Sequence, residues 1–101
     1  MKITKAVLSK QLPEGATVSQ LGSKQLFIVD HENCKVLYSY REPIGFMING
    51  AWSFNDEFFS FTTSRHLAYF IKESSKEYHK SSPYLFRTAL WENARWSLWG
   101  Y

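Results

Sequence analysis

The sequence predicts an α+β fold, in which an antiparallel β-meander of five to seven strands is followed by two C-terminal helices packed on one face. Three observations support this prediction. Short runs of alternating apolar and polar residues fill the first half of the chain. An Asn-Gly pair at 49–50 joins two such runs, and helix-capping residues follow at 62–64 and 82–83. With 101 residues, the chain 1–101 is expected to form a single domain.

Four strands are expected before residue 42, each bounded by turn residues. Their ranges are Lys2–Leu8, Thr17–Leu21, Lys24–Asp30 and Lys35–Arg41. Gly22-Ser23 is expected to form a two-residue hairpin turn, and residues 30–33 a polar turn. In the fourth strand, period-2 alternation places Val36, Tyr38 and Tyr40 on one face. Glu42-Pro43 should interrupt the sheet, because proline cannot donate to a ladder of hydrogen bonds.

The clearest local signal is a β-hairpin, in which Asn49-Gly50 joins Ile44–Ile48 to Ala51–Phe54. Both turn residues tolerate positive φ, so a type I′ turn is favoured and fixes the register. The expected partners are Ile48 with Ala51, Met47 with Trp52, and Gly45 with Phe54. Side chains should then share faces as two sets, Ile44 with Phe46 and Ile48, and Met47 with Trp52 and Phe54.

The rest of the chain predicts one further strand, Phe58–Phe61, and two helices. Hydroxyl residues 62–64 are expected to cap the first helix, which buries Leu67, Phe70 and Ile71. Polar residues 73–81 should end it. Ser82 as N-cap and Pro83 at the first position begin the second helix. Its expected buried residues are Leu85, Phe86, Ala89, Leu90 and Trp96.

Composition indicates the compartment and the kind of surface. The chain has one cysteine, no signal-peptide pattern and no apolar run long enough to cross a bilayer, so we expect no membrane association and a location in the cytoplasm in which the protein is made. Eight Phe, six Tyr and four Trp are more aromatic residues than a small core hides, so some should be exposed. The net charge of +3 allows an acidic partner without requiring one.

An aromatic and basic stripe on the second predicted helix is the main candidate for binding a partner. Its residues are Tyr84, Arg87, Trp91, Arg95 and Trp99, with Trp52 and Tyr69 as further candidates. Trp, Tyr and Arg are the residues enriched at protein–protein hot spots. The same alternation of rings and cations binds single-stranded nucleic acid. The stripe can equally pack on its own domain, or join two copies of the chain as a homodimer.

No pattern in the sequence indicates catalysis, a cofactor or a metal. Ser64 and His66 are adjacent but one at a helix start, so their side chains diverge and do not form a nucleophile–base pair. His31 and Cys34 offer two possible zinc ligands, but a structural site needs four. We therefore expect a protein that is not an enzyme, with no cofactor and no metal.

Basic residues near the first helix offer a possible anion site. Arg41 follows a strand and Arg65 opens the helix, where free N–H groups favour negative charge. The other possibility, which we favour, is an internal ion pair with Glu42 or Asp56. In a nucleic-acid-binding protein, Arg65 and Lys72 would add to the C-terminal stripe.

The segment Ser39–His66 carries the motifs of a more specific pattern, which covers Ser39–Ile71 as a whole. Ser39-Tyr40-Arg41-Glu42-Pro43, then Gly50-Ala51-Trp52, then Ser60 to His66 (SFTTSRH) resemble small uncharacterised proteins carried by bacteriophages and plasmids. The resemblance implies an accessory protein of a mobile element. The expected function is binding to a host macromolecule, for example to inhibit a defence system such as CRISPR. The alternative is a nucleic-acid-binding module that uses the C-terminal helix.

Overall fold

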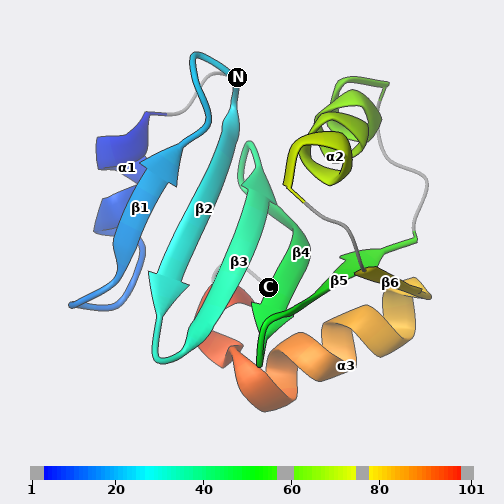
Figure 1. Cartoon of the computed structure of the whole chain (residues 1–101). Coiled ribbons are helices and arrows are strands. Elements are labelled where there is room, and N and C mark those ends of the chain that lie inside the picture. The colour runs from blue at the N-terminus through cyan, green and yellow to red at the C-terminus, as the bar shows by residue number, and fades with distance from the viewer. Residues whose placement is uncertain (1–3, 57–60, 75–77, 99–101) are drawn as a thin grey trace.

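A single six-stranded sheet, in the order β1-β2-β3-β4-β5-β6, forms the centre of the molecule (Figure 1). The computed structural model describes residues 4–56, 61–74 and 78–98. The strands are β1 (Thr17–Gln20), β2 (Leu26–His31), β3 (Cys34–Ser39), β4 (Glu42–Ile48), β5 (Ala51–Asn55) and β6 (Tyr78–Ser81). The helices are α1 (Lys5–Lys10), α2 (Phe61–Ser74) and α3 (Pro83–Asn93), and a short 3₁₀ helix, η1 (Arg95–Leu98), follows. The predicted α+β class is confirmed.

The first five strands form the antiparallel meander, and β6 departs from it. It pairs with β5 in parallel. Two parallel neighbours need a crossover connection, and α2 lies in that connection. The polar segment 73–81 was expected only to end a helix, so β6 is an addition to the prediction. Its first three residues are exposed, so it lacks the apolar alternation that announces a strand.

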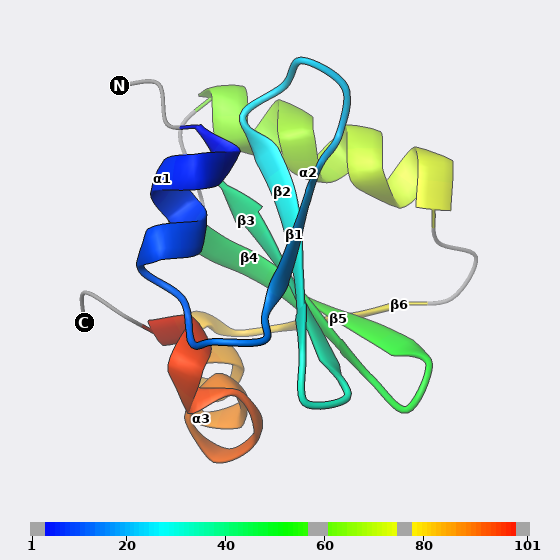
Figure 2. The ribbon, with the colours of Figure 1, turned by 90° about the vertical axis from the view of Figure 1, so that its left-hand side faces the viewer.

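Two apolar clusters lie on opposite faces of the sheet, because neighbouring residues of a strand point to opposite sides. The first cluster contains Phe27 of β2 and Tyr38 of β3, and is covered by α1 and α3 through Leu8, Phe86 and Leu90. Figure 2 shows α1 and α3 together on that side.

The second cluster contains Leu26, Leu37 and Phe54, and is covered by Phe70 of α2. The two C-terminal helices therefore cover opposite faces, which corrects the expectation that both pack on one face. Because both faces are covered, the central strands are apolar on both sides.

The predicted hairpin is confirmed in turn and register. Asn49 and Gly50 have φ of 55° and 80°, and the pairs Ile48↔Ala51, Met47↔Trp52 and Gly45↔Phe54 form as expected. The predicted faces need one correction, because Ile44 belongs to the second cluster while Phe46 and Ile48 lie with the first.

An irregularity between β3 and β4 explains the position of Ile44. Leu37 pairs with Gly45 but Tyr38 pairs with Pro43, which leaves Ile44 as an extra residue. The bulge also accommodates Pro43, so Glu42-Pro43 begins β4 instead of interrupting the sheet. Tyr40, expected on the face of Val36 and Tyr38, instead has φ of 57° after the end of β3.

The N-terminal prediction was wrong in kind. Residues expected as a strand over Lys2–Leu8 form α1, and residues 1–3 lie outside the described part of the chain. Thr4 caps this helix, since its hydroxyl accepts from the N–H of Val7 at 3.1 Å. The turn expected at Gly22-Ser23 is also longer, because the N–H of Leu21 bonds to the carbonyl of Leu26 across it.

The helix starts were predicted with mixed success. α2 begins at Phe61, so residues 62–64 lie in its first turn and do not cap it, and residues 58–60 of the expected strand lie outside the described part. At α3, Ser82 accepts from the N–H of Leu85 and Pro83 follows, as predicted. Leu85 itself is 59% exposed, so its predicted burial was wrong. No helix in the described ranges is long and apolar enough to cross a membrane.

Candidate functional site

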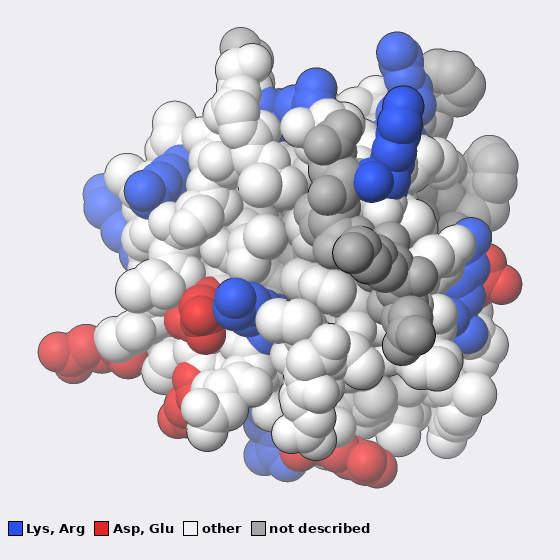
Figure 3. Space-filling model, viewed as in Figure 1, with Lys and Arg blue, Asp and Glu red and all other residues white. Residues whose placement is uncertain are grey.

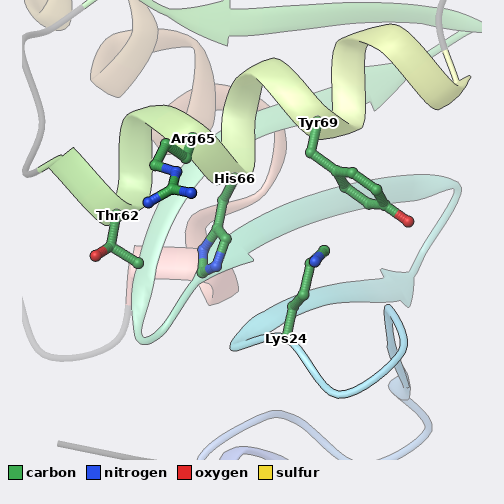
Figure 4. Close-up of a pocket in the computed structure, with 5 residues that line it drawn as sticks. All are labelled: Lys24, Thr62, Arg65, His66 and Tyr69. Carbon is green, nitrogen blue, oxygen red and sulfur yellow. The ribbon is translucent and has the colours of Figure 1, made fainter.

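A polar pocket lies between α2 and the connection of β1 to β2, and we call it the α2 pocket. Its lining residues are Lys24, Thr62, Arg65, His66 and Tyr69, and its volume is about 320 Å³ (Figure 4). Four of the five come from the first three turns of α2, at the i, i+3 and i+4 spacing that puts helical residues on one face. Lys24 comes from the β1–β2 connection, and its Nζ lies 4.8 Å from the centre of the Tyr69 ring.

The imidazole of His66 is positioned by a buried pair of hydroxyl groups, those of Ser39 and Thr63. Ser39 Oγ, at the end of β3, lies 3.0 Å from both Thr63 Oγ1 and His66 Nδ1, within hydrogen-bond distance of each. A hydroxyl both donates and accepts, so Ser39 engages Nδ1 in either tautomer of the ring and leaves Nε2 for the pocket. The ring of Tyr40 lies 5.9 Å away, tilted against the imidazole.

The charge state of His66 follows from its surroundings. Burial first, and the charge of Lys24 second, lower the pKa of His66 below its usual value of 6.5. The imidazole is therefore mainly neutral at pH 7. It lies in a pocket whose charged lining groups, Lys24 and Arg65, are both cations.

A serine beside a histidine raises the question of nucleophilic catalysis. The predicted divergence of Ser64 from His66 fits the structure, because Ser64 lines a different groove. Ser39 does meet His66, but it is 1% exposed and is also hydrogen-bonded to Thr63. A nucleophile must reach its substrate, so this geometry fits a positioning role for Ser39.

Part of the stripe predicted to bind a partner is exposed on α3. Tyr84 is 76% exposed and Trp91 is 54% exposed on α3. A hollow of about 330 Å³ lies between them, and Arg95 stacks on Trp91 with its guanidinium carbon 4.0 Å from the ring centre. We call this the α3 surface and define it by Tyr84, Arg87, Thr88, Trp91, Arg95 and Leu98. Trp99 lies outside the described residues.

Two further candidates for partner binding, Trp52 and Tyr69, lie outside the α3 surface. Trp52 is only 8% exposed and packs against Phe54 and Phe70 in the second cluster, so it is a core residue and not a partner-binding one. Tyr69 is exposed, but it lines the α2 pocket. Because α2 and α3 cover opposite faces, Tyr69 does not extend the α3 surface.

The three predicted anion-binding residues do not form one site. Arg41 donates to Gln11 Oε1 at 2.7 Å, and Arg65 lines the α2 pocket. Lys72 lies in a groove of about 420 Å³ between α2 and β6, together with Lys80 and Tyr78. In the upper part of Figure 3, which corresponds to the position of α2 in Figure 1, the coloured residues are Lys and Arg, with no Asp or Glu among them.

The possible metal ligands His31 and Cys34 pair across the β2–β3 turn. Burial first, and the charge of Asp30 second, raise the pKa of the Cys34 thiol to about 11, so the thiolate that binds metals is scarce at neutral pH. His31 Nε2 lies 3.4 Å from Glu32 Oε1. Within the described ranges, no three His, Cys, Asp or Glu residues gather as metal ligands do.

Comparison with known proteins gives one relationship. Curated proteins and solved structures contain no match. Among models of protein families, one matches residues 10–84, a range that contains the whole α2 pocket and the Ser39–His66 segment and ends before Arg87. The matching model is that of a family of unknown function (DUF8033), and the chain belongs to this family.

Proposed function

We propose that this chain is a non-enzymatic interaction module that occupies the surface of another protein through the α3 surface. The observation that carries the proposal is the 54% exposure of Trp91 beside an apolar hollow. A large ring left in water is stabilised when a partner covers it, and Trp, Tyr and Arg dominate the binding energy of protein interfaces. Arg95 stacks on this ring, which reduces the ordering cost of binding.

We further propose that the chain is an accessory protein of a phage or another mobile element, and that its partner is a host protein. A component of a CRISPR defence complex is an example of such a partner. The resemblance of the Ser39–His66 segment supports this origin. The burial of Ser39, whose hydroxyl lies 3.0 Å from His66 Nδ1, supports the proposal that the chain is not an enzyme.

The test compares capture of host proteins by three forms of the chain. We expect wild type and Tyr69→Ala to retain the same partner, because Tyr69 is exposed on the opposite face. Trp91→Ala should weaken binding of the purified partner by more than tenfold, as hot-spot truncations do. Urea unfolding of each form checks that it is folded. Equal binding by Trp91→Ala and wild type would remove the proposal.

A nucleic-acid-binding module is the second candidate, favoured by Lys24 and Arg65 in the α2 pocket and by Lys72 and Lys80 in the groove between α2 and β6. Titration with single- and double-stranded DNA and RNA separates the two candidates. Contacts with phosphates predict an affinity that falls steeply between low and near-physiological salt. The α3 surface predicts a weak dependence on salt. A homodimer through the α3 surface would appear as a concentration-dependent dimer that Trp91→Ala abolishes.

A further inference from the structure

We propose that the α2 pocket binds a nucleoside monophosphate, with the phosphate on Lys24, Arg65 and His66 and the base on Tyr69. The ligand is either a free nucleotide or the 5′-terminal nucleotide of an oligonucleotide. This inference is independent of the proposed function, because the α2 pocket and the α3 surface lie on opposite faces of the sheet.

The charges of the pocket select an anion. Lys24 and Arg65 belong to different elements and both line the pocket, and its described lining contains no carboxylate. Figure 4 shows the Lys24 ammonium between the β1–β2 connection and Tyr69, while Arg65 lies near Thr62. A guanidinium and an ammonium in one pocket suit the oxygens of a phosphate, and the Thr62 hydroxyl adds a donor.

His66 adds a ring nitrogen for an oxygen of the phosphate. Its Nδ1 is engaged with Ser39, so Nε2 is the ring atom left for a ligand. With Ser39 on Nδ1, the tautomer that carries its hydrogen on Nε2 donates that hydrogen to an oxygen of the phosphate dianion, the form that predominates at neutral pH. The Ser39 and Thr63 hydroxyls are buried, which fixes the ring before the ligand arrives.

Tyr69 accounts for the nucleoside. Tyr69 is 41% exposed and lines the same pocket, and Lys24 lies over its ring. Flat rings beside cations bind nucleotides because the base stacks while the cation meets the phosphate. A volume of about 320 Å³ lies at the lower end of the range for small-molecule sites, which suits one nucleotide.

Isothermal titration calorimetry with adenosine 5′-monophosphate, adenosine and inorganic phosphate tests the proposal on the full chain. We expect adenosine 5′-monophosphate to bind at least tenfold more tightly than either fragment. Lys24→Gln should weaken it about tenfold, and Tyr69→Leu should weaken it similarly while leaving inorganic phosphate unchanged. The matched control is Lys10→Gln, because Lys10 is also exposed but lies on α1.

The outcomes are distinct. The proposal is overturned if adenosine binds as well as its monophosphate, if no heat is detected, or if Lys10→Gln weakens binding as much as Lys24→Gln. A 5′-phosphorylated oligothymidylate and its 5′-hydroxyl form then identify the source. Preference for the phosphorylated oligonucleotide over thymidine monophosphate assigns a nucleic-acid end, and the reverse assigns a free nucleotide. Loss of binding in Lys24→Gln leaves capture through Trp91 unchanged, so the two proposals fail separately.

Discussion

At the scale of the residue, Ser39 connects the sheet to the α2 pocket. Its hydroxyl reaches Thr63 and His66, both on α2, from the end of β3. All three side chains are polar, and an apolar core excludes such groups unless they are hydrogen-bonded. The contact joins the two ends of the Ser39–His66 segment in space, although Ser39 and His66 are 27 positions apart in the chain.

Ser39→Ala should therefore destabilise the protein by about 1–3 kcal/mol, the cost of leaving buried hydrogen-bonding groups without a partner. Urea unfolding followed by far-UV circular dichroism measures the loss. Ser23→Ala is the matched control, because Ser23 is exposed in the β1–β2 connection and its change should stay within about 0.5 kcal/mol. Equal stability of the two variants would show that the Ser39 network contributes nothing.

At the scale of the element, the β4–β5 hairpin makes a prediction that starts in the sequence. The register places Gly45 opposite Phe54, and a Cβ atom at Gly45 would lie 2.6 Å from Phe54 Cδ1. Phe54 is fully buried and stacks on Trp52, so its ring has little room to move. Gly45→Ala should cost about 1–3 kcal/mol through overpacking.

A double-mutant cycle with Phe54→Leu checks the cause of that loss. The smaller side chain makes room, so Gly45→Ala should cost clearly less in the Phe54→Leu background than in wild type. Urea midpoints of the four proteins give the coupling energy. If Gly45→Ala cost the same in both backgrounds, the loss would have to come from the backbone and not from contact with the ring.

The same element shows what a sequence can and cannot predict here. Asn49-Gly50 fixes its turn through the φ preferences of two adjacent residues, so the register was predictable. The position of Ile44 was not, because the bulge depends on how β3 pairs with β4. The pairing of Ser39 with His66 and the parallel addition of β6 are also long-range, and no local pattern reports them. Trp52 is buried and Trp91 is exposed, and this difference also depends on long-range packing that no local pattern reports.

At the scale of the whole molecule, one sheet carries two cores. The first cluster is closed by α1 and α3, and Tyr38 donates its hydroxyl to the carbonyl of Ser97 at 2.9 Å across it. The second is closed by α2. Both clusters use side chains of the same strands, since Val36 and Leu37 are neighbours that point to opposite faces. Loss of either cluster removes support from the strands that build the other.

The two clusters should therefore unfold together, and two tryptophans report on them separately. Trp52 belongs to the second cluster, while Trp96 packs against the first. Variants that keep only one of these tryptophans, with the others replaced by Phe, should each show a fluorescence transition in urea that coincides with far-UV circular dichroism. Comparison within each variant cancels the effect of the substitutions on stability. A Trp96 transition at lower urea than the loss of secondary structure would mean that α3 detaches first, leaving the sheet and α2 as a separate folding unit.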